Sequence, residues 1–392
     1  MNFENVHTIE DTESAYKLLS KKSSYIEWQK FEVLNVLPLM KASPREDSVK
    51  LYSNDYLSLS QHPKILASQI QSIQHMNEEI MMSGVFLNNV SQQGQLEKKM
   101  AHFLKSEETI LCQSGYFANL GLIQALAEPG MVIHIDENAH CSLWEGAIRS
   151  GARIFYFKHN DVSHLQKKIH QFGPGLIVID SVYSTLGAQA RLEEIVEIGV
   201  QNNCIMVVDE SHSLGTHGSL GEGLVAELGL EEKVHFRTAS LSKSFVCRAG
   251  IITCLAKYKH YITHSASPFI FSSALQAHEI ARIDAVLEEV KIAHEQRKLV
   301  KRNTHIIRKE IEGLGIHLLG SEQIIPLIAG TKEAAFMLRD FLEERNVFGA
   351  IFIPPATAKD HCMVRLSVHA ALKESEISYL LEVIKKAKKF LL

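Results

Sequence analysis

Six short apolar runs in the centre of the chain constrain its fold more than any other feature. Their apolar residues are consecutive rather than alternating, and helix-like polar stretches separate them; the runs are 131–135, 154–157, 176–179, 205–208, 234–236 and 251–254. Such runs are typical of strands buried on both faces, which occur mainly in parallel sheets. Segments 162–171 and 192–202 have the pattern of crossover helices. The sequence therefore predicts an α/β fold, with a mostly parallel central sheet, helices on both faces, and ligands at the carboxyl ends of the strands.

The pattern changes after residue 277. Apolar residues then recur at spacings of three and four up to Gly313 and Gly315, which predicts one long amphipathic helix. Residues 316–392 indicate a smaller α+β unit that closes with a basic helix over 374–390. We therefore expect an N-terminal segment, 1–50, that packs against either unit. A large domain, 51–285, follows, and then a small C-terminal domain, 286–392, that begins within the long helix.

Composition narrows the class of protein. The chain has 392 residues, of which 46% are hydrophobic, and its net charge is -4. Proteins that bind nucleic acid usually carry an excess of positive charge, so nucleic-acid binding is not indicated. No apolar stretch is long enough for a membrane span, and the N-terminus lacks the apolar core of a signal peptide. The six cysteines include no CxxC pair, so neither a zinc site nor a disulfide framework is indicated. These features predict a cytoplasmic protein with reduced thiols.

Three of the apolar runs end in an acid, at Asp136, Asp180 and Asp209. Aspartate at such a position often only caps the next helix, and for Asp136 and Asp180 that interpretation is as good as a functional one. Asp209 is followed by His212 and a glycine-rich loop, which together suit the wall of a cofactor site. Among twenty histidines, however, His212 could equally be a core or solvated residue. His212 and His217 have no recognised metal-ligand spacing, so no metal site is predicted.

Lys243 stands in a stretch rich in hydroxyl groups, residues 238–244, directly after the run 234–236. Hydroxyls and backbone N–H groups at a strand end can bind a phosphate, while a lysine amine can form an imine with a carbonyl compound. A solvated loop lysine is the competing interpretation, because most lysines are exposed. The residues alone thus indicate an α/β enzyme with an imine-forming lysine as a hypothesis.

Taken together, Asp209-x-x-His212 and Lys243 resemble the signature of fold-type I pyridoxal phosphate enzymes. More narrowly, the chain is similar to the α-oxoamine synthases, from residues 53–57 to residues 365–367. This resemblance implies a fold-type I transferase fold and a homodimer. It also implies pyridoxal 5'-phosphate as the cofactor, held by Lys243 as an imine.

The resemblance also assigns roles around the cofactor ring. Asp209 would pair with the protonated pyridine nitrogen and keep the ring an electron sink. His212 would hydrogen-bond the phenolic oxygen, and His140 would stack on the ring. Ser181 would lie near the ring. With Lys243, the residues Asp209, His212 and His140 make up the expected catalytic set.

Further residues are expected around the phosphate and the substrate. Ser114, Gly115 and Tyr116 match a turn into a helix whose N–H groups hold the phosphate. Either Ser240 or Thr238 would add a hydroxyl, and the two remain alternatives. Ser272 and Ser273 resemble a segment that reaches the partner subunit's phosphate. The predicted substrate-binding residues are Asn54, Tyr56 and Arg365; Arg365 would grip the substrate carboxylate.

One departure narrows the branch of the family. The α-oxoamine synthases usually carry a Gly-x-Gly-Gly-Ser-Arg stretch, whereas residues 82–89 contain one glycine and no arginine. Four other stretches are closer to the α-hydroxyketone autoinducer synthases of bacterial quorum sensing; they are 140–146, 183–187, 209–218 and 238–241.

The branch resemblance implies a decarboxylative condensation of an amino substrate with a medium- or long-chain acyl-CoA. The amino substrate would be 2-aminobutyrate or S-adenosylmethionine, and the product an α-aminoketone precursor of an α-hydroxyketone. The apolar run 80–87 is a candidate lining for an acyl channel, with a core helix as the alternative. Two other functions remain open: another α-oxoamine synthase of small-molecule metabolism, and a non-catalytic regulator that binds the cofactor.

Overall fold

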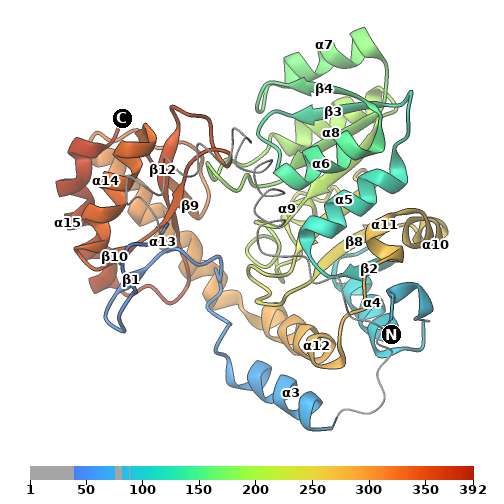
Figure 1. Ribbon diagram of the computed structural model, residues 1–392, viewed down its shortest axis with the longest axis horizontal. Helices are drawn as coiled ribbons and strands as arrows, with labels where there is room; N and C mark the ends of the chain where they lie inside the picture. Colours follow the sequence, from blue (N-terminus) through green and yellow to red (C-terminus); the bar gives the residue numbers. More distant parts are fainter. Residues whose placement is uncertain (1–38, 76–81, 88) are drawn as a thin grey trace, which may run out of the picture.

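A seven-stranded sheet forms the centre of the computed structural model, which describes residues 39–75, 82–87 and 89–392 (Figure 1). Its strands run in the order β2 (Glu108–Cys112), β8 (Gly250–Cys254), β7 (Phe236–Ser240), β6 (Ile205–Asp209), β5 (Leu176–Asp180), β3 (Val132–Asp136) and β4 (Arg153–Phe157). β8 runs antiparallel to the other six strands of this sheet. The prediction of a mostly parallel central sheet is therefore confirmed.

Helices cover both faces of this sheet, as predicted. On one face lie α5 (Gly115–Leu126), α6 (Cys141–Ser150), α10 (Ala256–Ser265) and α11 (Ser267–Ile270); on the other lie α7 (Val162–Phe172) and α8 (Leu192–Gln201). Successive side chains of β5 point to opposite faces, so Leu176 and Val178 join one apolar cluster while Ile177 and Ile179 join the other. Burial on both faces explains the consecutive apolar residues in the sequence.

A second, smaller unit contains most of the C-terminal residues (Figure 1). Its antiparallel sheet has the order β11 (Ala350–Phe352), β12 (Cys362–Ser367) and β9 (Ile324–Gly330), and it packs against α14 (Lys332–Glu343) and α15 (Glu374–Ala387). A short β1 (Val49–Lys50) pairs with β10 (Val347–Phe348), and Val49 and Leu51 enter the apolar core of this unit. Residues 39–50 are the described part of the N-terminal segment, and its last residues pack against the small C-terminal unit. Residues 1–38 lie outside the described chain.

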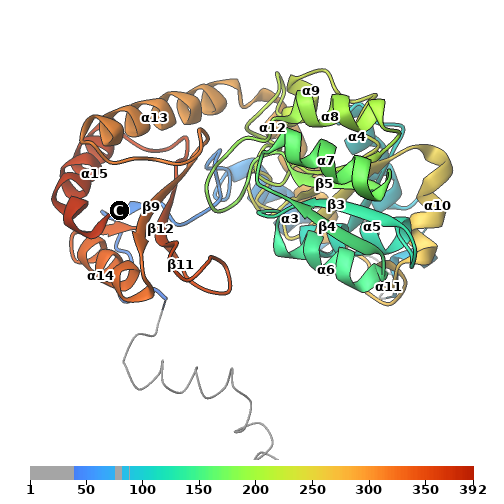
Figure 2. The ribbon, with the colours of Figure 1, turned by 90° about the horizontal axis from the view of Figure 1, so that it is seen from above.

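The prediction of one long helix after residue 277 is wrong, because the segment forms two helices. α12 (Ala277–Ile292) and α13 (His294–Gly313) meet at Ala293, which is buried. The buried Arg297 donates from Nη1 to the carbonyl of Val290 at 2.7 Å, so a side chain satisfies a carbonyl at the break. α13 then runs from the large unit to the small one (Figure 2).

The run 234–236 was predicted as a strand, but β7 begins at Phe236 and continues to Ser240. Val234 precedes the strand, and its side chain packs in the apolar cluster that contains residues of α7 and α8. The second half of β7 is polar, and its Thr238 is the strand partner of Asp209. A search for apolar runs therefore could not identify this part of the strand. The remaining elements are α3 (Pro63–Gln74), η1 (Gly84–Phe86), α4 (Gln92–Phe103), α9 (Leu224–Glu227) and η2 (Lys388–Phe390).

The search for membrane spans covered the described part of the chain. None of its helices combines the length and the apolar character needed to cross a bilayer.

Gly250 is predicted to be essential for the close contact between β8 and the start of α5. A Cβ at this position would lie 2.1 Å from the carbonyl oxygen of Ser114, which is backbone and cannot move away cheaply. Gly250→Ala should therefore lower the free energy of unfolding by about 1–3 kcal/mol, as overpacking does. Urea denaturation measures this. Gly313→Ala is the control, because a Cβ there meets nothing within 4 Å; equal destabilisation by both changes would contradict the argument.

Candidate active site

A pocket of about 240 Å³ opens at the carboxyl ends of β5, β6 and β7, beside the first turns of α5 and α6. It brings together eight predicted site residues: Lys243, Asp209, His140, His212, Ser114, Gly115, Tyr116 and Ser240. Asn119, Ser142, Asp180, Ser211 and Ser242 also line it. The edge of the sheet predicted to hold a ligand is thus where the predicted residues converge.

Asp209 lies at the floor of this pocket and is only 3% exposed. Its Oδ1 accepts a hydrogen bond from the Ser211 N–H at 2.7 Å, and its Oδ2 accepts one from Asn119 Nδ2 at 2.6 Å. Asp180 is its partner on the neighbouring strand; burial, and then the charge of Asp209, raise the pKa of Asp180 well above its ordinary value. Two buried acids side by side make the floor a favourable place for a positive charge.

Lys243 follows β7 by three residues and reaches the same pocket. Burial lowers the pKa of its amine, and the charges of Asp209 and Asp180 oppose that effect. A lowered pKa increases the share of unprotonated amine, which is the form that attacks a carbonyl carbon. Lys243 is half-buried in the wall of the pocket, whereas the competing interpretation expected a solvated loop lysine.

His140 and His212 are both held as neutral rings. Burial lowers the pKa of His140, which caps the N-terminus of α6 and whose backbone N–H donates to Asp180 at 2.9 Å. Burial, and then the charge of Lys243, lower the pKa of His212 well below its ordinary value. Nδ1 of His212 lies 2.7 Å from the hydroxyl of the fully buried Tyr56. Burial raises the pKa of Tyr56, so it stays a hydroxyl group.

The opposite end of the pocket is rich in hydrogen-bond donors. Ser114 caps α5 by accepting from the Phe117 N–H, and the hydroxyls of Ser240 and Ser242 lie 2.7 Å apart. A Cβ on Gly115 would lie 2.5 Å from Cβ of Ser240, so glycine lets the start of α5 approach the end of β7. Free N–H groups at a helix start and neighbouring hydroxyls suit a phosphate. Of the two alternatives for the added hydroxyl, Ser240 lines the pocket, whereas the Thr238 hydroxyl donates to Oδ1 of Asn119.

Several predicted residues lie outside the lining of the pocket. The Ser181 hydroxyl is buried behind it, 3.0 Å from the carbonyl oxygen of Asp209. Ser272 and Ser273 are on the surface side of the chain, where Ser273 pairs with Ser83. The predicted substrate residues form one network: Arg365 donates to Oδ1 of Asn54 at 2.8 Å and to the Ser184 carbonyl at 2.7 Å, and Asn54 Oδ1 lies 3.2 Å from the Tyr56 hydroxyl.

Sequence reasoning did not assign Asn119, Ser142, Ser211 or Ser242 to the site. Asp180 was noticed as an acid at a strand end, but capping was an equally good explanation. The signal that could have found Asn119 is its chemistry, since it is a buried amide within the mostly apolar helix α5.

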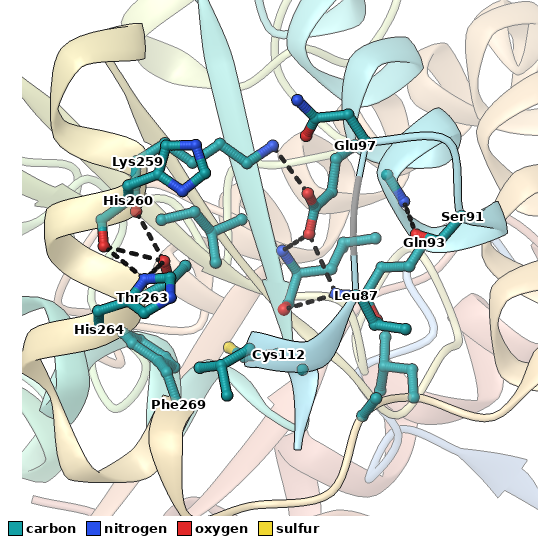
Figure 3. A pocket seen from close by; sticks show the side chains of 18 of the residues that line it. Leu87, Ser91, Gln93, Glu97, Cys112, Lys259, His260, Thr263, His264 and Phe269 are labelled. Carbon is teal, nitrogen blue, oxygen red and sulfur yellow. Dashed lines mark hydrogen bonds and ion pairs between the residues drawn. The ribbon is translucent and has the colours of Figure 1, made fainter. Parts of the chain in front are cut away.

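A second pocket, of about 220 Å³, is lined in part by the β2 residues Ile110, Leu111 and Cys112 (Figure 3). Lys259 is paired there with Glu97 and Glu108, both at 2.8 Å. Apolar groups of Leu87, Cys112 and Phe269 form other parts of its wall. Residues 82–87 form the short η1 and its flanks rather than the core helix that was one alternative, and residues 80–81 lie outside the described chain. Glu97, Lys259, His260 and His264 line this pocket, but none of the predicted site residues does, and its lysine is paired with acids.

His212 is predicted to make the protein sensitive to acid. In the unfolded chain this histidine binds a proton below about pH 6.5, whereas the folded pocket excludes the proton, so stability is present above that pH and is lost as the pH falls. His212→Asn should reduce the loss of unfolding free energy between pH 7.5 and pH 5.5 by up to about 1.4 kcal/mol per pH unit. Urea denaturation at the two pH values measures it, with the exposed His102→Asn as control. An unchanged pH dependence in His212→Asn would contradict the prediction.

Comparison with known proteins identifies the family. A family model described as aminotransferase class I and II matches residues 46–384. The CAI-1 autoinducer synthase of Vibrio campbellii is 40% identical over 344 residues, which cover 88% of each chain. A serine palmitoyltransferase of Bacteriovorax stolpii is 29% identical over 346 residues, which cover 87% of this chain and 82% of the relative.

Solved structures confirm the fold. The structure of the Sphingomonas wittichii serine palmitoyltransferase superimposes with a TM-score of 0.87 at 24% identity, covering 95% of this chain and 98% of the other. The fold-type I class, the α-oxoamine synthase resemblance, the expected acyltransferase class and the expected cofactor, pyridoxal 5'-phosphate, all agree with these findings. The chain therefore belongs to the aminotransferase class I and II family.

Proposed function

We propose that this chain joins an amino substrate to an acyl-CoA and thereby makes the α-aminoketone precursor of an α-hydroxyketone autoinducer. The observation that carries the proposal is the single pocket in which Lys243, Asp209, His140 and His212 meet. The 40% identity to an autoinducer synthase supports the specific product class.

The residues of the pocket fit pyridoxal 5'-phosphate in size and in chemistry. Lys243 would hold its aldehyde carbon, Asp209 would face its protonated ring nitrogen, and the neutral ring of His140 would lie on its face. Ser240 and the N–H groups at the start of α5 would hold its phosphate. When bound, this cofactor supplies an electron sink for a negative charge that develops at the substrate Cα.

The chain's own groups then orient the substrate and move its protons. Lys243, whose pKa is lowered by burial, is placed to take a proton from the substrate Cα once its amine is free. Arg365 is buried, and no described residue provides a hydrogen-bond partner for its Nε. A substrate carboxylate would satisfy this donor, since an unsatisfied buried charged group is costly. We therefore assign the carboxylate to Arg365, with Asn54 holding the guanidinium.

The condensation itself forms a bond between the substrate Cα, which has given up a proton, and the acyl carbonyl carbon. The thioester bond breaks, and coenzyme A takes a proton and leaves as its thiol. The bond from Cα to the carboxylate then breaks, CO2 leaves, and Cα takes a proton in its place, which gives the α-aminoketone. We assign the acyl chain to the side of the second pocket. Leu87 and Phe269 offer apolar surface there, and Gln113 of that pocket is next in sequence to Ser114 of the first.

The reaction is tested with a matrix of substrates. The purified protein, loaded with pyridoxal 5'-phosphate, is incubated with 2-aminobutyrate, S-adenosylmethionine, serine, glycine or alanine, each with acyl-CoAs of increasing length. We expect coenzyme A release, measured with a thiol reagent, only when both substrates are present. 2-Aminobutyrate or S-adenosylmethionine should be preferred, together with a medium or long acyl chain.

Lys243→Ala is the decisive variant for the same assay. It should lose the visible absorbance of the lysine-bound cofactor and all detectable coenzyme A release, because Lys243 is the one lysine among the described residues that line the pocket. Preference for alanine, glycine or serine would favour another α-oxoamine synthase of metabolism. A protein that binds the cofactor but releases no coenzyme A with any pair would favour the non-catalytic regulator.

We further propose that the protein is a homodimer and that its second copy covers the face near η1. Met82, Phe86 and Phe271 are exposed there, and Phe271 is 82% exposed. The Ala274 N–H donates to the Met82 carbonyl at 2.7 Å, so the two segments form one surface. Exposed apolar groups gathered in this way mark an interaction site. Ser272 and Ser273, which stand away from the chain's own pocket, would reach the partner's phosphate from this face.

Phe271→Asp is expected to convert the dimer into a monomer and to lower activity, because a charge is placed in an apolar interface. Sedimentation velocity measures the assembly state, and coenzyme A release measures the activity. Val200→Asp, a similar change at an exposed valine at the end of α8, is the control and should stay dimeric. A fully active wild-type monomer at the assay concentration would refute the proposal.

A further inference from the structure

We propose that Asn119 is a positioning residue that holds Asp209 and His140 in one fixed arrangement for the cofactor. The inference rests on the proposed function, in which these two groups meet the ring nitrogen and the ring face. Asn119 lies in the second turn of α5, is 1% exposed, and sits among apolar neighbours such as Ala118 and Leu122. A buried amide in an apolar helix is costly unless each of its polar atoms is bonded.

The direction of each bond around Asn119 is determined by chemistry. The carboxylate of Asp209 accepts and does not donate, so the atom 2.6 Å from its Oδ2 must be the amide nitrogen of Asn119. The amide oxygen then points to Thr238, whose hydroxyl donates to it. Thr238 is in turn the strand partner of Asp209. The amide thus has one orientation, and that orientation aims its N–H at the acid.

The second N–H of the same amide leads to His140. Nδ2 of Asn119 lies 2.9 Å from the hydroxyl of Ser142, and that hydroxyl lies 2.7 Å from Nδ1 of His140. The backbone N–H of Ser142 also donates to this Nδ1, so Nδ1 carries a lone pair and the proton of the neutral ring is on Nε2. The Ser142 hydroxyl therefore donates to His140 and accepts from Asn119, and every bond in the chain runs one way.

One side chain consequently links three separate elements, the ends of β6 and β7 and the start of α6. Asp209 and His140 come from different parts of the sequence, and Asn119 and Ser142 connect the carboxylate of the first to the ring of the second. A supporting residue of this kind acts through the groups it orients rather than by touching the reacting atoms. Removing it should weaken the binding of the cofactor while leaving the other residues of the pocket in place.

The test measures the rate at which pyridoxal 5'-phosphate leaves the loaded protein after dilution into a trapping reagent. Asn119→Asp has the same shape but places a second negative charge against Asp209, and Asn119→Leu removes all three hydrogen bonds. Both should release the cofactor at least about tenfold faster than wild type, because a hydrogen bond to a charged group is worth roughly that factor. If the Leu variant does not fold, the Asp variant carries the test.

Two comparisons separate positioning from a general loss of stability. In an Asp209→Ala background, Asn119→Leu should add little further effect, since the group it acts through is gone. Asn303→Leu, at an asparagine that is 3% exposed and bonded to backbone carbonyls in the small unit, should leave the release rate unchanged.

The outcomes distinguish this inference from the proposed function. If Asp209→Ala releases the cofactor at the wild-type rate, the assignment of the pocket fails. If Asp209→Ala accelerates release but both Asn119 variants behave like wild type, only the inference is overturned. It is equally overturned if Asn119→Leu keeps its full effect without Asp209.

Discussion

The carboxylate of Asp209 is the constraint on which the rest of this structure depends. It is buried at the end of β6, beside a second buried acid, Asp180, at the same register on β5. A buried charge requires hydrogen bonds and a positive partner. The Ser211 N–H and the Asn119 amide supply the hydrogen bonds, and the amine of Lys243, after the next strand, lines the same pocket. The pocket is therefore an electrostatic arrangement prepared for a ligand that carries positive charge on one side and a phosphate on the other.

The small unit is fastened to this arrangement by polar contacts. Gln323 donates to the carbonyl of His212 at 2.7 Å, and His217 pairs with Glu322 at 3.2 Å. Arg308 on α13 bonds four backbone carbonyls between Leu319 and Ile324, which fixes the loop that carries both contacts. Through β12 the same unit delivers Arg365 to Asn54 and to the network behind His212. Under the proposed role of Arg365, the position of the small unit would determine where the substrate carboxylate binds.

Much of the fold could be predicted because parallel strands buried on both faces have a clear sequence pattern. The elements that were misjudged lie where that pattern is interrupted. β7 is displaced because its polar end faces the site, and the helix after residue 277 is broken where Arg297 satisfies a carbonyl. α5 has no polar face, since α6, α10 and α11 cover it, so periodicity could not reveal it. The first turn of α5 was indicated by the resemblance to a protein family and not by the spacing of apolar residues.

By itself, the sequence determined the α/β class, the three acids at strand ends and the combination of Asp209, His212 and Lys243. Those features are local, because they depend on the order of apolar and polar residues along short segments. Only the tertiary structure decided which hydroxyl lines the pocket, Ser240 rather than Thr238, and that Tyr56 stands behind His212. It also revealed Asn119 as the link between two distant segments. Such choices depend on the direction of side chains across neighbouring strands and helices, and sequence spacing contains no record of that direction.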